Sequence, residues 1–329
     1  MSKILTVVLG GFLMFPFEIT ARQRTYEIER VSVIRASIPV TVRMPAGLWH
    51  LDGAVDEAGN IYVSFSLWRP ASERGGPIKT APYLIKYNQA GEMMRMFPLP
   101  EKTEIVTSIA YREGRVYVSA VEGGRGRILT FDSTGELKQV INLNDLLPHE
   151  VEPSTGGSLY VLAADHDSQR ILKLSPSGET LTSWLSAAGE TQKGFSFPQR
   201  SFKPVMAIDE SGHAIYVLHS GEIQVLDPKG AGIRTLRKEG AGLVSSAFCD
   251  GKDLVFVRRE SGRTFIAFLG ERGDLYEREI TGQLSPMFKG SDGYYYGLGL
   301  LGIPPNTSAA QFEILVAKFR MQKSLASTR

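Results

Sequence analysis

Along most of the chain, short apolar runs that carry an aromatic residue follow directly on groups of turn residues. The six copies of this pattern cover residues 56–64, 112–119, 156–162, 209–218, 250–257 and 291–296. Gly, Asp, Glu, Asn or Ser stands before apolar runs such as 61–63 and 116–118, which both contain a tyrosine between aliphatic residues. A pattern that returns at this spacing indicates a repeat architecture in which each unit packs on its neighbours.

Each copy continues with a second apolar run and a glycine-containing turn. These continuations cover residues 83–92, 127–136, 170–179, 222–230, 264–273 and 313–319. Apolar and polar residues alternate within the runs, and Asn, Asp, Ser, Pro and Gly bound them, which is typical of antiparallel strands joined by turns. A further strand precedes the aromatic strand, as at 105–111, 204–208 and 243–248. No stretch has a sustained helical period with caps, so we expect an all-β chain.

Four antiparallel strands in each of six units predict a six-bladed β-propeller. We name the strands of a blade A to D from the centre outward. The last unit supplies only strands A, B and C, at 286–289, 293–298 and 312–319, and segments 31–34 and 38–42 precede the first unit. We therefore expect a propeller over residues 22–320, closed by the N-terminal strand joining the last blade, and a polar C-terminal tail at 321–329.

Two phrases recur in the units, Gly-x-Ile/Val-Tyr-Val and Ile-x-x-Tyr/Phe-Asp/Asn-x-x-Gly-Glu. Residues 59–63 and 114–118 carry the first phrase, and residues 128–136 carry the second. On these phrases the chain resembles the NHL-like six-bladed propellers over roughly residues 45–319. The resemblance implies the propeller fold and leaves the activity open, because one such fold hosts many functions.

Composition excludes several classes of partner. The chain has 329 residues, of which 43% are hydrophobic, and this is enough for a large core. Lys and Arg number 37 against 35 Asp and Glu, and they form no basic block, so nucleic acid and anionic membrane surfaces are not expected partners. The single cysteine, Cys249, cannot form an internal disulfide and reads as a small core residue.

The N-terminus has the pattern of an export signal. Lys3 precedes a nearly unbroken apolar run at 4–17, and polarity begins at Glu18. This predicts a signal peptide over residues 1–21 with cleavage after Ala21, and hence a periplasmic or extracellular protein. The run is short for a membrane span and no later stretch is long enough, so we expect no stable span after cleavage. The alternatives are an uncleaved anchor or a buried first strand.

The long insertions of the repeat are predicted on one face. In a four-stranded antiparallel blade, the B-to-C and D-to-A connections open on the same face. The insertions at 65–82, 185–203 and 299–311 all belong to these connections. Insertions gathered on one face of a propeller indicate the binding face, here for a protein, peptide or glycan. Trp68 and Arg200 lie in these insertions; Trp68 could be a stacking platform or a cover for the blade edge.

Polar side chains gather where the A strands begin, near the predicted channel. Aligning the units brings together His50, Asp52, Thr107, Ser108, His149, Glu150, Lys203, Ser245, Ser246 and Ser285. We favour a polar, water-filled channel. The alternatives are a divalent metal such as calcium held by Asp52, His149 and Glu150, or a metal-free acid–base pair of His149 and Glu150. The candidate ligand-binding residues are His50, Asp52, Trp68, Ser108, Arg200, Lys203 and Ser245.

Three functions remain open at this point. The first hypothesis is an exported binding or interaction module that uses the long-loop face. The second is a metal-assisted hydrolase or lyase, similar to propeller lactonases, with its site at the channel mouth. A redox-cofactor propeller is favoured least, because Trp49, Trp68 and Trp184 do not recur at one position of the blade. Whether the protein is an enzyme is left undecided.

Overall fold

The structure is a computed structural model. It describes residues 24–38, 42–43, 47–69, 79–165, 169–185, 205–209, 214–219, 222–229, 232–237, 243–261, 263–270, 274–280, 284–301, 309–310 and 313–325. The predicted signal peptide, most of the 185–203 insertion, and Arg200 and Lys203 lie outside the described residues. Contacts divide the chain into two compact units, one of Ile28–Met321 and one of Met1–Glu27 with Gln322–Arg329. In the smaller unit, Arg24–Glu27 and Gln322–Leu325 are described, and both are strand.

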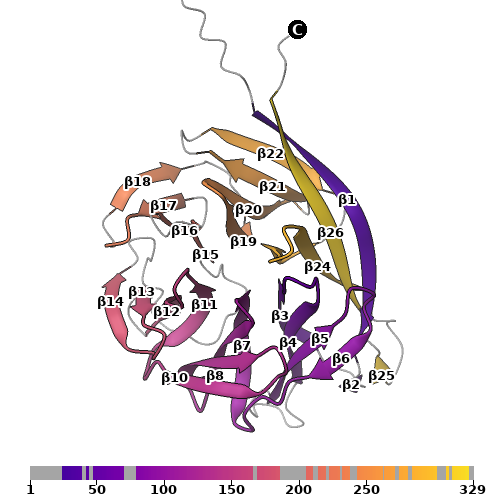
Figure 1. Cartoon of the computed structure of the whole chain (residues 1–329), viewed down its shortest axis with the longest axis vertical. Helices are drawn as coiled ribbons and strands as arrows, with labels where there is room; N and C mark the ends of the chain where they lie inside the picture. The colour runs from indigo at the N-terminus through magenta and orange to yellow at the C-terminus, as the bar shows by residue number, and fades with distance from the viewer. Residues whose placement is uncertain are drawn as a thin grey trace, which may run out of the picture. The chain divides into compact units, whose positions relative to one another are not determined.

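The unit of Ile28–Met321 contains six four-stranded antiparallel sheets arranged as a ring of blades (Figure 1), which confirms the predicted all-β propeller. Blades 1 and 2 consist of β3 (Gly47–Val55), β4 (Ile61–Arg69), β5 (Lys79–Tyr87), β6 (Met93–Met96), β7 (Thr103–Arg112), β8 (Arg115–Glu122), β9 (Arg125–Asp132) and β10 (Leu137–Asn142). Blades 3 and 4 consist of β11 (Leu147–Pro153), β12 (Leu159–Ala164), β13 (Gln169–Leu174), β14 (Thr180–Leu185), β15 (Val205–Ile208), β16 (Ile215–His219), β17 (Glu222–Leu226) and β18 (Gly232–Arg237). Blades 5 and 6 consist of β19 (Leu243–Asp250), β20 (Asp253–Glu260), β21 (Arg263–Leu269), β22 (Leu275–Ile280), β23 (Met287–Lys289), β24 (Tyr295–Leu301), β26 (Glu313–Leu325) and β1 (Arg24–Ser37).

Blade 6 joins the two ends of the chain, as predicted. Its strand order is β1-β26-β24-β23, so the N-terminal strand is the outer strand of the last blade. The C-to-D turn of blade 1 packs directly on β1, because a Cβ added at Gly91 would lie 2.6 Å from Ile34 Cγ2 and from the Arg35 carbonyl oxygen. Gly91 has a φ of +85°, which also favours glycine. Residues 321–325, expected in the polar tail, continue strand β26.

Apolar clusters between blades explain the recurring aliphatic–Tyr–aliphatic phrase. Successive side chains of a strand point to opposite faces of its sheet. The B-strand tyrosine therefore faces the next blade, and its aliphatic neighbours face the preceding one. The structure shows Tyr62 packed with Val116 and Val118, Tyr117 with Leu159 and Val161, and Tyr160 with Ile215 and Val217. Burial of these alternating faces holds adjacent blades together.

Two blades carry the same polar triad beside the B-strand tyrosine, buried in blade 1 and partly buried in blade 6. In blade 1, Asp56 accepts a hydrogen bond from the Tyr62 hydroxyl at 3.2 Å and pairs with Lys86 Nζ at 3.3 Å. In blade 6, Asp292, Tyr296 and Lys318 repeat this arrangement, with distances of 2.6 Å to the hydroxyl and 2.9 Å to the ammonium. Burial, together with the negative charge of Asp56, raises the pKa of Tyr62. The sequence pattern did not predict these triads.

The insertion expected at 65–82 is strand at both ends. β4 continues to Arg69 and β5 begins at Lys79, and Trp68 of β4 is paired with Thr80 of β5. The prediction of a loop across this whole range was wrong, because Phe65 and Leu67 are buried and continue the strand face of Ile61 and Val63 in one apolar cluster. β24 likewise continues to Leu301, and Ala309–Ala310 (β25) pairs with Val42–Arg43 (β2).

Within the described residues, no helix is long and apolar enough to cross a membrane.

Candidate functional site

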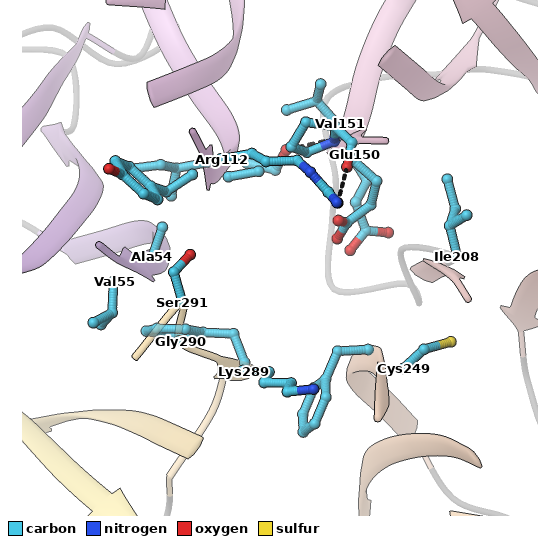
Figure 2. A pocket seen from close by; sticks show the side chains of 18 of the residues that line it. Ala54, Val55, Arg112, Glu150, Val151, Ile208, Cys249, Lys289, Gly290 and Ser291 are labelled. Carbon is cyan, nitrogen blue, oxygen red and sulfur yellow. Dashed lines mark hydrogen bonds between the residues drawn. The ribbon is translucent and has the colours of Figure 1, made fainter. Parts of the chain in front are cut away.

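A cavity of about 910 Å³ occupies the centre of the ring of blades. Its lining runs from the middle of the A strands to the A-to-B turns, where Glu57, Glu113, Thr155 and Ser291 contribute. Figure 2 shows Arg112 extending towards blade 3 near Glu150, with Lys289, Gly290 and Ser291 on another side of the cavity. The described cavity therefore lies towards one end of the channel, the end at which the short A-to-B turns lie.

One A-strand side chain in each of four blades accepts a hydrogen bond from the backbone of the next blade. We call these side chains, Asp52, Ser108, Glu150 and Ser246, the latch residues. The four bonds run from Ile109 N to Asp52 Oδ2 (3.1 Å), Val151 N to Ser108 Oγ (3.0 Å), Met206 N to Glu150 Oε2 (2.5 Å) and Met287 N to Ser246 Oγ (3.0 Å). Inner strands leave a row of unpaired N–H groups along the channel, and each bond satisfies one of them. The latch residues therefore connect neighbouring blades.

A β-bulge stands directly before the latch residue in blades 2, 3 and 5. The extra residues are Thr107, His149 and Ser245, where the register shifts between the inner strand and its partner. A bulge bends its strand and re-aims the side chains around it. The adjacent polar pairs aligned from the sequence thus have a common structural explanation, in which the second member forms the latch.

The structure separates the predicted site residues into groups. Asp52, Ser108 and Glu150 line the cavity. His50, His149 and Ser245 lie on the same kind of inner strand, nearer the D-to-A connections, and are not among the described lining residues. Trp68 lies in strand β4.

The described part of the chain holds no group of three or more His, Cys, Asp and Glu side chains that could bind a metal ion. Two of the predicted ligands, Asp52 and Glu150, each accept a backbone N–H from the next blade. Metal binding by Asp52, His149 and Glu150, with calcium as the expected ion, stays a prediction.

Glu152 is a cavity residue that sequence reasoning missed. It lies two residues after Glu150 on β11 and lines the cavity. Its side chain makes no hydrogen bond and no ion pair with the described residues. Burial raises the pKa of the Glu152 carboxyl well above its ordinary value, the charges of Glu150 and Asp52 raise it further, and Arg112 opposes them. Strand alternation could have found it, because residues i and i+2 share one face.

Arg112 crosses from blade 2 to blade 3 at the edge of the cavity. Its guanidinium donates to the Pro153 carbonyl at 3.2 Å and to Thr155 Oγ1 at 2.8 Å. Similar links join other blades at this end of the channel: the Tyr111 hydroxyl donates to Glu57 at 2.6 Å, and Lys289 pairs with Asp250 at 3.1 Å. The cavity walls are thus fixed by contacts between blades.

Stability should depend on pH through Glu152. Because the folded protein holds this proton more tightly than the unfolded chain, the contribution of Glu152 to stability is fully present below the ordinary pKa of 4.5. It is lost as the pH rises through the raised pKa. We expect Glu152→Gln to remove this loss, so that its unfolding free energy falls less than that of the wild type between pH 4.5 and pH 8. Denaturant titrations across this range measure the difference, with the exposed Glu101→Gln as control; parallel profiles for all three proteins would contradict the assignment.

Comparisons with known proteins support the fold alone. No family model matches the sequence, and no curated protein matches it. Among solved structures, a protein of unknown function from Bacteroides caccae is 17% identical, with 72% of this chain and 83% of that chain covered and a TM-score of 0.50. The PQQ-bound aldose sugar dehydrogenase of Streptomyces coelicolor is 11% identical, with 91% and 99% covered and a TM-score of 0.50. A protein from Lactobacillus plantarum is 12% identical, with 75% and 76% covered and a TM-score of 0.50.

The six-bladed propeller implied by the sequence resemblance is therefore confirmed. Membership of the NHL-like family stays a prediction.

Proposed function

We propose that the chain is an exported β-propeller that binds a protein, peptide or glycan through the face that carries its B-to-C and D-to-A connections. The observation that carries this proposal is the position of the long connections. They join β4 to β5, β14 to β15 and β24 to β26. Because the strands are antiparallel, these connections all leave from the same end of their blades. Long connections on a rigid scaffold are a common location for recognition.

The blade contacts support a scaffold role. Asp52, Ser108 and Glu150 bind the backbone of the next blade, and this use fixes the inner strands around the channel. A rigid ring can present loops with a small entropic cost of binding. Export rests on the N-terminal sequence pattern, and the expected compartment is the periplasm or the extracellular space.

Shortening the loops tests the binding face. Replacing residues 71–77 in one variant and 187–202 in another by short Gly-Ser linkers should weaken binding to immobilised peptide or glycan ligands about tenfold or more, equal to about 1.4 kcal/mol. A Gly-Ser insertion between Gly156 and Gly157, in an A-to-B turn of the other face, serves as control. Undiminished binding by both shortened variants, with thermal unfolding unchanged, would rule out this face.

A metal-assisted hydrolase or lyase is the second candidate. The observation that favours it is the meeting of Asp52, Glu150 and Glu152 in one cavity, where desolvation first, and then the charges of Glu150 and Asp52, raise the pKa of Glu152. A carboxyl with a raised pKa in a cleft is a candidate general acid or base. Elemental mass spectrometry of the mature protein, followed by a screen of lactone and ester substrates, tests this reading. One divalent ion per chain, lost in Asp52→Asn and Glu150→Gln, would favour it over the binding module.

A further inference from the structure

Each blade has one A-strand residue that pairs with the tyrosine position of its B strand, and the six equivalent residues face the same way in their blades. The chemistry of this residue differs from one side of the cavity to the other. From blade 1 to blade 6 this position is occupied by Ala54, Ala110, Glu152, Ala207, Phe248 and Phe288. All of these except Ala207 line the cavity. The ring of equivalent positions thus combines one carboxyl, two phenyl rings and three small side chains.

The carboxyl and the phenyl rings belong to opposite parts of the ring. The inner strands contact one another in the order β3, β7, β11, β15, β19, β23 and back to β3. Blade 3, with Glu152, is therefore across the channel from blade 6, with Phe288, and Phe248 is in the adjacent blade 5. Of the three alanines at the remaining positions, Ala54 and Ala110 also line the cavity.

The two phenyl rings are held in place by tyrosines of their own sheets or neighbours. Phe288 stacks on Tyr296 with 5.9 Å between ring centroids and an interplanar angle of 14°. Phe248 lies 5.7 Å from Tyr295 in a tilted arrangement. Such supported rings offer a fixed apolar wall and a negative π face to a ligand.

The other carboxylates of the cavity already have partners. Asp52 and Glu150 accept backbone N–H groups. Glu57 accepts the Tyr111 hydroxyl at 2.6 Å, Glu113 pairs with Arg112 at 3.6 Å, and Asp209 accepts Ala214 N at 3.1 Å. The side chain of Glu152, which is half-buried, makes no hydrogen bond or ion pair with the described residues. A cationic ligand would give this carboxylate a charged hydrogen-bond partner.

We propose that this cavity is a binding site for a small organic cation, an ammonium group attached to an aromatic or aliphatic body. The ammonium pairs with Glu152, and the apolar body lies against Phe248 and Phe288. The volume of about 910 Å³ is within the range that holds a small-molecule ligand. This site is separate from the long-loop face, so the failure of either proposal leaves the other standing.

Calorimetry with benzylammonium as probe tests the site. Titrations of the full chain should show saturable binding of benzylammonium by the wild type. Glu152→Gln should bind at least about tenfold more weakly, the equivalent of about 1.4 kcal/mol, because it loses the ion pair. Glu113→Gln, which removes a charge at the mouth of the cavity, should stay within about twofold of the wild type.

Two further measurements keep the result decisive. Phe248→Leu should weaken benzylammonium binding several-fold, and circular dichroism checks that each variant is folded. Benzyl alcohol, the neutral analogue, should bind far more weakly than benzylammonium. Equal binding of the alcohol, unchanged affinity in folded Glu152→Gln, or no wild-type binding at about 10 mM probe would overturn the proposal, since millimolar affinity is the weakest that a specific site would show.

Discussion

Replacing Asp56 with alanine is expected to lower the free energy of unfolding by about 3–5 kcal/mol, the cost of removing one partner from a buried ion pair. Asp56 is 5% exposed and Lys86 is 8% exposed. The carboxylate also accepts Asn60 N at 2.8 Å and Asn60 Nδ2 at 2.9 Å. Alanine would leave the Lys86 ammonium, the Tyr62 hydroxyl and the turn amide without this acceptor. Urea denaturation of the purified variant measures the loss.

A double variant separates the ion pair from the rest of the triad. Asp56→Ala with Lys86→Met removes both charges, and we expect it to recover about 1–3 kcal/mol relative to Asp56→Ala alone. Asp145→Ala, at an exposed aspartate, is the matched control and should stay within about 0.5 kcal/mol of the wild type. A loss below about 1 kcal/mol in Asp56→Ala would show that water reaches Lys86 and that the pair is not a buried one.

Replacing the latch residue Asp52 with alanine is expected to lower the free energy of unfolding by about 2–4 kcal/mol, since each buried donor left unsatisfied costs about 1–3 kcal/mol. Asp52 accepts Ile109 N at 3.1 Å and Gly53 N at 2.9 Å. In blades 2, 3, 4 and 6, the N–H that follows the latch position donates to the latch residue of the preceding blade. Gly53 N is the equivalent N–H of blade 1, and the preceding blade 6 has Pro286 at the latch position, which has no side-chain acceptor. Gly53 N therefore donates to Asp52 of its own blade. Guanidinium denaturation measures the change, and amide hydrogen exchange at Ile109 should accelerate.

The asparagine variant distinguishes the latch from a metal ligand. Asp52→Asn keeps a side-chain acceptor, so we expect it to retain most of the stability that Asp52→Ala loses. If Asp52 served chiefly as a metal ligand, both variants would lose the ion and its stabilisation together. Equal losses for the two variants, accompanied by loss of a bound metal, would therefore contradict the latch.

The fold could be predicted because its determinants are local and repeated. A run such as Ile61-Tyr62-Val63 carries its own alternation, and the turn residues before it mark where the strand begins. The closing role of β1 followed from counting strands in the last unit, which lacked an outer one. The predicted end of β4 was too early. The turn residues at 70–77 indicate a loop, and the prediction extended this loop over Phe65 and Leu67, which are buried strand residues.

The candidate site could be predicted only in part, because its chemistry arises between blades. Aligning the repeats grouped Asp52, Ser108 and Glu150 together, and all three line the described cavity. Which atom each side chain meets depends on the distance between neighbouring inner strands, and no single repeat encodes this distance. Glu152 was missed because its position carries alanine or phenylalanine in the other blades, so the aligned units gave no polar pattern there.

The pairing of β1 with β26 also orders events during synthesis. Strand β1 leaves the ribosome first, yet its partner is encoded by the last part of the repeat region, so blade 6 cannot form until almost the whole chain has been made. Until then a long strand with apolar side chains has no native neighbour and is a target for chaperones or for wrong pairing. A circular permutant that opens the chain in the connection between β10 and β11, and joins the present ends, would make β26 and β1 consecutive. Such a permutant should fold with fewer aggregated by-products at equal final stability.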